Sequence, residues 1–221
     1  MKKYMWLLLV VLFIIGGCGM NNDPEENVSP SEMNAEDLPD VPALQDEFTR
    51  KFIQSTKPVR EGFYPFLSKS KSFTMDFPED MVISNRTHNI GPDDRSETIT
   101  FADVDKTKEI FVNYSLRYFK GEPNVEYTMI RMTESHDREL EFRDIETDNN
   151  SNLSIAEYRP DEQFYIIAVF IWNTHGQINL TIRLRCNDKL EANQCSEKTN
   201  SEKEKLMKQI KSINIINSKK E

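Results

Sequence analysis

Residues 164–186 read FYIIAVFIWNTHGQINLTIRLRC, and this stretch decides the fold. Its first part, residues 164–172, has no polar group beyond a tyrosine hydroxyl, so we expect it to form the central strand of a sheet. Its last part, residues 178–185, alternates aliphatic with polar side chains, which is typical of a strand with one buried face. The polar segment 174–177 between them predicts a hairpin turn, and therefore two antiparallel neighbours.

Outward from this hairpin, alternation predicts five more strands, and apolar residues at helical spacing predict three helices. Strands that follow one another through short turns favour an antiparallel sheet, and helices that do not alternate with strands favour the α+β class. We therefore predict an α+β fold in which two or three helices cover an antiparallel β-sheet. The strands are expected at residues 72–77, 97–102, 110–118, 139–143 and 153–159, and the helices at 42–55, at 123–135 and around Leu206, Ile210 and Ile213.

The order of these elements resembles the PsbP/Mog1-like fold. The resemblance rests on a phenylalanine-rich opening strand that ends in Phe77-Pro78, a mid-chain helix, a meander of strands, and a final helix that runs into Ser212-Ile213. It covers about residues 72–216, and residues 80–83 stand where members often carry a tryptophan. The resemblance implies a small exported protein, since bacterial members of the group include many lipoproteins. A fold of this kind does not by itself give a function.

The composition excludes some classes of function. The chain has 221 residues, with 28 Lys and Arg against 37 Asp and Glu, and a formal charge of -9. An acidic balance argues against a nucleic-acid partner, whose phosphates need a basic face. Three of the seven glycines lie within residues 16–19, which leaves too few elsewhere for a glycine-rich phosphate loop. The sequence also contains no Gly-x-Ser-x-Gly motif, the signature of a serine nucleophile on a sharp turn.

The N-terminus predicts export. Lys2 and Lys3 precede an uninterrupted apolar run of eleven residues, 5–15. Because a transmembrane helix needs about 20 apolar residues, this run is too short to span a bilayer and fits the hydrophobic region of a secretory signal. We predict a signal peptide over residues 1–17.

The end of this segment, Ile15-Gly16-Gly17-Cys18, resembles the lipobox of bacterial lipoproteins. The resemblance implies transfer of a diacylglyceryl group to the Cys18 thiol and cleavage before Cys18. Small residues at 16 and 17 let a processing enzyme approach the backbone beside the thiol. Two acyl chains anchor a protein stably where one would be marginal. The predicted location is therefore the cell membrane, with the lipid-anchored chain on its extracytoplasmic side.

The predicted domain organisation follows from the composition after Cys18. Residues 18–41 hold seven carboxylates, three prolines and no basic side chain, so we predict a disordered acidic tether. Residues 42–70 are predicted to form a helix over 42–55 and a loop at 59–70 whose aromatic side chains dock on the domain. Residues 71–217 are predicted to form the α+β globular domain.

Cys186 and Cys195 are the two remaining cysteines, nine positions apart. Outside the membrane, an even pair at this spacing favours a structural disulfide that closes a short loop. The alternative, a redox or metal pair, lacks the Cys-x-x-Cys spacing and a neighbouring histidine.

Two further patterns bear on metal binding. Asp148, Asn150 and Asn152 begin a calcium-loop pattern, but Leu153 replaces the glycine of the sharp turn and Arg159 replaces the bidentate glutamate. The histidines are too far apart in the sequence to form a helical metal motif, so we expect each to be solvent-exposed or to cap a helix. No metal, cofactor or catalytic residue is predicted. The histidines are His88, His136 and His175.

These observations favour a membrane-anchored, extracytoplasmic lipoprotein that acts as a non-catalytic binding module. The expected partners are the membrane, through the Cys18 lipid, and an envelope protein or cell-wall component, and no nucleic acid. A small-molecule-binding lipoprotein is the first alternative, although about 155 folded residues are few for two lobes around a cleft. An envelope hydrolase is the second alternative.

Overall fold

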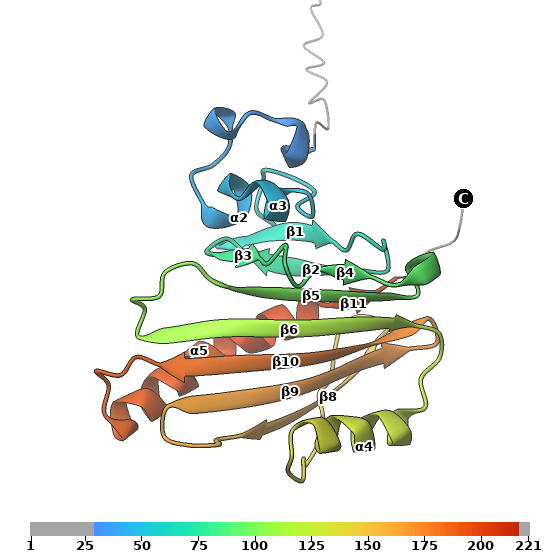
Figure 1. Ribbon diagram of the computed structural model, residues 1–221, viewed down its shortest axis with the longest axis vertical. Helices are drawn as coiled ribbons and strands as arrows, with labels where there is room; N and C mark the ends of the chain where they lie inside the picture. Colours follow the sequence, from blue (N-terminus) through green and yellow to red (C-terminus); the bar gives the residue numbers. More distant parts are fainter. Residues whose placement is uncertain (1–28, 217–221) are drawn as a thin grey trace, which may run out of the picture.

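The computed structural model describes residues 29–216, which form two antiparallel sheets and a few helices (Figure 1). The predicted signal peptide, Cys18 and the first part of the predicted tether lie outside the described residues. The large sheet has the strand order β3-β5-β6-β10-β9-β8-β7, with β4 paired to β5, and the small one has the order β1-β2-β11. The elements are η1 (Pro30–Glu32), η2 (Ala35–Asp37), α2 (Pro42–Gln45), α3 (Glu47–Arg50), β1 (Phe63–Leu67), β2 (Phe73–Pro78), β3 (Met81–Ile83), β4 (Asn89–Ile90), η3 (Pro92–Asp94), β5 (Ser96–Asp103), β6 (Ile110–Lys120), α4 (Val125–Ser135), β7 (Arg143–Asp144), β8 (Asn152–Tyr158), β9 (Phe164–Asn173), β10 (Gly176–Cys186), α5 (Ala192–Ser212) and β11 (Asn214–Ile215).

The predicted hairpin is present and forms the middle of the large sheet. Strand β10 pairs antiparallel with β9 on one side and with β6 on the other, along almost its whole length. The middle position belongs to β10, and β9 lies beside it, so the prediction of the central strand was wrong by one strand. The α+β class with an antiparallel sheet is confirmed.

One face of the large sheet forms the main core. The aliphatic side chains of β10 and the facing side chains of β6 and β9 are buried there. Helix α5, which passes behind β6 and β10 in Figure 1, and the small sheet cover this face. The side chains that the alternation predicted to face the core are buried there, including Tyr114, Leu116, Leu180 and Ile182.

Helix α4 covers only part of the other face. A second, smaller apolar cluster joins Met132 and the following Leu140 to Ala156 of β8 and to Ala168 and Phe170 of β9. Strand β9 is therefore buried on both faces, which explains its continuous apolar sequence. No residue of β10 or β6 belongs to this cluster, and the polar alternate positions of those two strands remain open.

The segment before the domain differs from the prediction. Residues 29–41 of the predicted disordered tether pack on the domain, with Pro30 and Leu38 buried. The predicted helix 42–55 is two short helices, because the backbone is extended at Asp46, whose side chain caps α3 by accepting the Thr49 N–H. Proline and acidic residues suggested disorder, but a few apolar side chains were enough to attach the segment to the core.

The region 59–70, predicted as a loop, contains strand β1, which pairs with β2. Its aromatic side chains are buried as expected, Phe66 with 1% of its surface exposed. The strand predicted at 139–143 is reduced to β7, and the short strands β3, β4 and β11 were missed. Strands of two or three residues have too few positions to show alternation. Among the described residues, no helix combines the length and the apolar character that a membrane span requires.

Cys186 and Cys195 form a disulfide, with their Cα atoms 5.7 Å apart, as the sequence predicted. The bond connects the end of β10 to the first turn of α5, and both cysteines are buried. It therefore joins the central strand to the helix that covers its apolar face.

We predict that the double variant Cys186→Ser/Cys195→Ser lowers the free energy of unfolding by about 2–3 kcal/mol, because a short closed loop is released in the unfolded chain. Denaturant unfolding of the oxidised protein and of the variant measures this difference. Free thiols at both positions in the purified native protein would contradict it.

Candidate functional site

The open part of the large sheet and helix α4 enclose a groove of about 840 Å³. Strands β5, β6 and β10 provide its floor, and the last turns of α4 provide one wall. The floor is polar because the alternate residues of these strands point away from the core. The floor residues include Thr100, Asn113, Ser115, Arg117, Asn179 and Thr181.

Two arginines of the floor have no partner within the described part of the chain. Arg117 of β6 and Arg183 of β10 are exposed, and their guanidinium groups form no ion pair or hydrogen bond with any described residue. In the register, Arg117 lies opposite Asn179 and Arg183 lies opposite Asn113. The two arginines are therefore four residues apart along the paired strands, which is about 13 Å at 3.3 Å per residue.

The positive character of the groove is not offset by its own lining. Arg131 adds a third guanidinium from α4, paired with Glu134 outside the groove. Of the described residues that line the groove, none carries a carboxylate. The groove is thus a cationic region on a chain whose formal charge is -9.

The floor also contains an acceptor without a donor. The Oδ1 atom of Asn179 is buried and has no hydrogen-bond partner among the described residues. A buried polar atom without a partner costs free energy, which a donor on a bound ligand would recover. Ser115 and Thr181, directly opposite one another, provide two hydroxyls beside it.

His136, at the C-terminus of α4, lies at the wall of the groove. Its Nδ1 is 2.8 Å from the hydroxyl of Tyr158, and its Nε2 is 3.3 Å from the hydroxyl of Thr181. Burial lowers the pKa of His136 below its ordinary value of 6.5, and the charges of Arg183 and Arg138 lower it further. The neutral imidazole is therefore favoured in the folded protein.

A hydroxyl beside a neutral histidine raises the question of nucleophilic catalysis. In acyl transfer, such a pair also needs free N–H groups that stabilise the oxyanion. Thr181 lies in the middle of β10, which is paired on both sides, so the ladders engage its backbone N–H groups. The arrangement of Thr181, His136 and Tyr158 therefore favours ligand contact over acyl chemistry.

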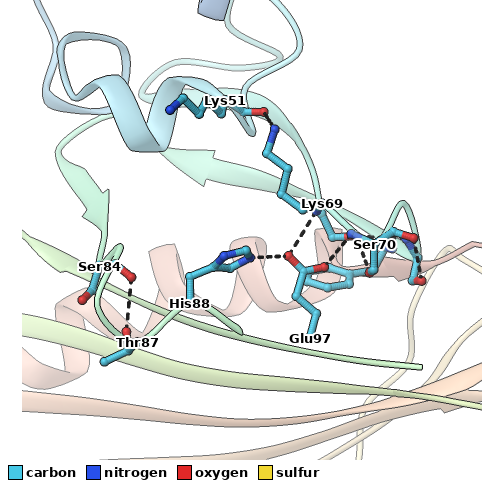
Figure 2. Close-up of polar contacts among 10 residues, drawn as sticks. Lys51, Lys69, Ser70, Ser84, Thr87, His88 and Glu97 are labelled. Atoms are coloured by element: carbon cyan, nitrogen blue, oxygen red, sulfur yellow. Dashed lines mark hydrogen bonds and ion pairs between the residues drawn. The ribbon is translucent and has the colours of Figure 1, made fainter. Parts of the chain in front are cut away.

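A second polar cluster surrounds Glu97 of β5, whose side chain is fully buried (Figure 2). One carboxylate oxygen accepts from the backbone N–H of Lys69 at 3.1 Å and lies 2.9 Å from His88 Nε2. The other accepts from the backbone N–H of Ser70 at 2.9 Å. Lys69 in turn donates its ammonium to the carbonyl of Lys51 at 2.6 Å.

These contacts identify the Glu97 cluster as a structural junction. Its partners come from the β1–β2 turn and from the segment before β4, and Lys69 extends the cluster to Lys51 just after α3, so one carboxylate connects the small sheet to the large one. Both oxygens are already occupied by protein donors, and buried charges are stable only when paired in this way. His88, predicted to be exposed or capping, instead has 13% of its side chain exposed.

The remaining sequence candidates lie at the β7–β8 connection. Asp148, Asn150 and Asn152 line an acidic surface hollow of about 490 Å³ with their neighbours. Asn149, between them, donates to the carbonyls of Lys211 and Ile213 and so holds the end of α5. Within residues 29–216, no group of three or more His, Cys, Asp or Glu side chains could hold a metal ion.

Sequence reasoning missed both the groove and the Glu97 junction. The polar residues of the groove were recognised as the outer faces of two strands, but their pairing in register could not be known from one strand at a time. The signal for Glu97 was present, since a carboxylate occupies the alternation position of Ile99 and Phe101, which face the core.

The chain is similar to known proteins in sequence and, weakly, in structure. The family model YvcA_Mog1p, described as "Putative lipoprotein YvcA", matches residues 39–214. A protein of Bacillus subtilis (strain 168) with the same description is 31% identical over 244 residues and covers all of both chains. A crystal structure of a Bacteroides thetaiotaomicron protein gives a TM-score of 0.39 at 13% identity, covering 72% of this chain and 50% of that one.

For the Glu97 junction, we predict that Glu97→Gln lowers the free energy of unfolding by about 3 kcal/mol, because the amide cannot accept from all three donors and His88 loses its partner. Thermal or denaturant unfolding measures the change. Glu122→Gln, at an exposed position, is the control and should change stability by less than about 0.5 kcal/mol. Equal stability of the two variants would show that the junction contributes nothing.

For His136, we predict a pKa below 6.5 by NMR titration of its ring, and a rise toward that value in Arg183→Gln. Because the unfolded chain takes up the proton first, the free energy of unfolding should fall as the pH drops below about 6.5. His136→Gln should lose this part of the pH dependence. A His136 pKa above 6.5 in the wild-type protein would contradict the prediction.

Proposed function

The chain belongs to the YvcA lipoprotein family, and from this membership we propose that it is a lipid-anchored extracytoplasmic protein that acts by binding an envelope component in the groove beside α4. The segment Ile15-Gly16-Gly17-Cys18, which resembles a lipobox, supports the anchor. Membership of a family described as lipoproteins supports it.

The observation that carries the binding proposal is the uncovered polar face of β6 and β10. Charged and polar residues on an exposed strand normally face water and need no explanation. Here, however, they line a concave groove with two arginines and a buried acceptor that find no partner among residues 29–216. Convergent polar groups in a concavity are the usual form of a binding site.

Capture of a small molecule is the second candidate, because the groove volume lies within the range of roughly 300–1,000 Å³ typical of such sites. Small-molecule sites are mostly apolar, however, whereas this floor is built largely from hydroxyl, amide and guanidinium groups. The polar lining therefore favours a larger, hydrated envelope component.

Photo-crosslinking in intact cells tests the proposal. A photoreactive residue replaces Ser115 in the floor of the groove, and the control carries it at Asn150, in the β7–β8 loop outside the groove lining. We predict a specific adduct from position 115 and none from position 150. In the Cys18→Ala background, incorporation of radioactive palmitate should be abolished and the adduct should decrease, because the protein is no longer held at the membrane.

Two results would contradict the proposal. Unchanged palmitate labelling of Cys18→Ala would reject the anchor. Adducts that form equally from positions 115 and 150 would reject the groove as the binding surface.

A further inference from the structure

The groove has a chemical character that narrows its ligand. We propose that it binds an extended, hydroxyl-rich chain that carries phosphate groups, such as a polyol phosphate polymer. The inference rests on the proposed function, since it names the class of ligand for the same groove. It is built from the charge, the spacing and the hydrogen-bonding capacity of the floor.

The charge of the floor selects an anion. Arg117 and Arg183 present guanidinium groups that no described residue pairs, and the groove lining includes no described carboxylate. The planar guanidinium fork binds phosphate and carboxylate oxygens with two parallel hydrogen bonds. A phosphodiester keeps its negative charge over the whole pH range of the cell envelope, so it can pair with the two guanidinium groups at any such pH.

The spacing of the arginines suits an extended ligand. The two positions are about 13 Å apart along the strands, so a ligand that follows the strands can meet both guanidinium groups. Between them the floor is continuous, and the open groove permits a ligand to extend beyond either end. A chain with repeated charges meets both arginines together, and the second contact adds to the first without a second loss of translational freedom.

The floor between the arginines selects hydroxyl groups. The buried Oδ1 of Asn179 needs a donor, and Ser115 and Thr181 can both donate and accept. A polyol supplies donors and acceptors along its length. A peptide would bind a sheet chiefly by adding a strand at an edge, but β6 and β10 are interior strands whose backbone groups are already paired.

His136 links this ligand to pH. The groups that face it are Tyr158, Thr181, Arg183 and Arg138, from β8, β10 and the chain after α4. A bound phosphate would offset the positive charges that disfavour its protonation. Binding should therefore become tighter as the pH falls toward 6, and His136→Gln should remove this effect.

The test uses the full-length lipidated protein in phosphatidylcholine vesicles, with fluorescently labelled poly(glycerol phosphate) as the probe. We expect the wild-type protein to bind it, and Arg117→Gln and Arg183→Gln each to weaken binding about tenfold. Arg86→Gln/Arg95→Gln, which removes two exposed charges outside the groove, should change affinity less than about threefold. Asn179→Leu should weaken binding of this probe and leave binding of poly-aspartate unchanged.

The outcomes separate this inference from the proposed function. Equal affinity for poly-aspartate or polygalacturonate of the same charge would overturn the phosphate and hydroxyl selection. Displacement of the probe by phosphatidylglycerol vesicles would assign the groove to a lipid headgroup instead. Absence of probe binding, with the adduct from position 115 retained in cells, would overturn the ligand class and leave the proposed function standing. Absence of both would overturn the two together.

Discussion

The pairing of β6 with β10 determines most of this structure. Eleven residue pairs run in one unbroken antiparallel register, from Gly176 opposite Lys120 to Cys186 opposite Ile110. Because side chains alternate in a strand, a shift of one residue would move every aliphatic side chain of β10 to the outer face. The register therefore fixes two surfaces at once, an apolar one that needs α5 and the small sheet, and a polar one that remains free.

The two helices divide these surfaces unequally. Helix α5 crosses the apolar face and is fastened to β10 by the disulfide, so that face is closed along its length. The apolar side of helix α4 packs on β8 and β9, where the outer face is apolar as well. Its edge next to β10 then becomes the wall of the groove. The groove thus exists because the outer face changes from apolar to polar between neighbouring strands β9 and β10.

The sequence predicts the helices and strands that are long enough for the periodicity of their apolar side chains to be recognised. Strands β6, β9 and β10 and helices α4 and α5 each extend over ten or more residues, and all were placed. Short strands and the broken helix at Asp46 were missed because two to four residues carry no period. The groove was not predictable, since it depends on which strands are neighbours. The burial of Glu97 could have been predicted, because a carboxylate at a position of a strand that faces the core needs a buried hydrogen-bond or ion-pair partner.

The position of positive charge on an acidic chain bears on specificity. A formal charge of -9 repels polyanions at a distance, and salt screens that repulsion beyond about 8 Å at physiological ionic strength. The arginines of the groove act only at contact, where hydrogen bonds add to the attraction. An anionic chain that fits the floor gains both the electrostatic attraction and the hydrogen bonds. A chain that meets another part of the surface gains neither. The acidic exterior therefore suppresses nonspecific binding and leaves the groove to select its ligand by shape and hydrogen bonding.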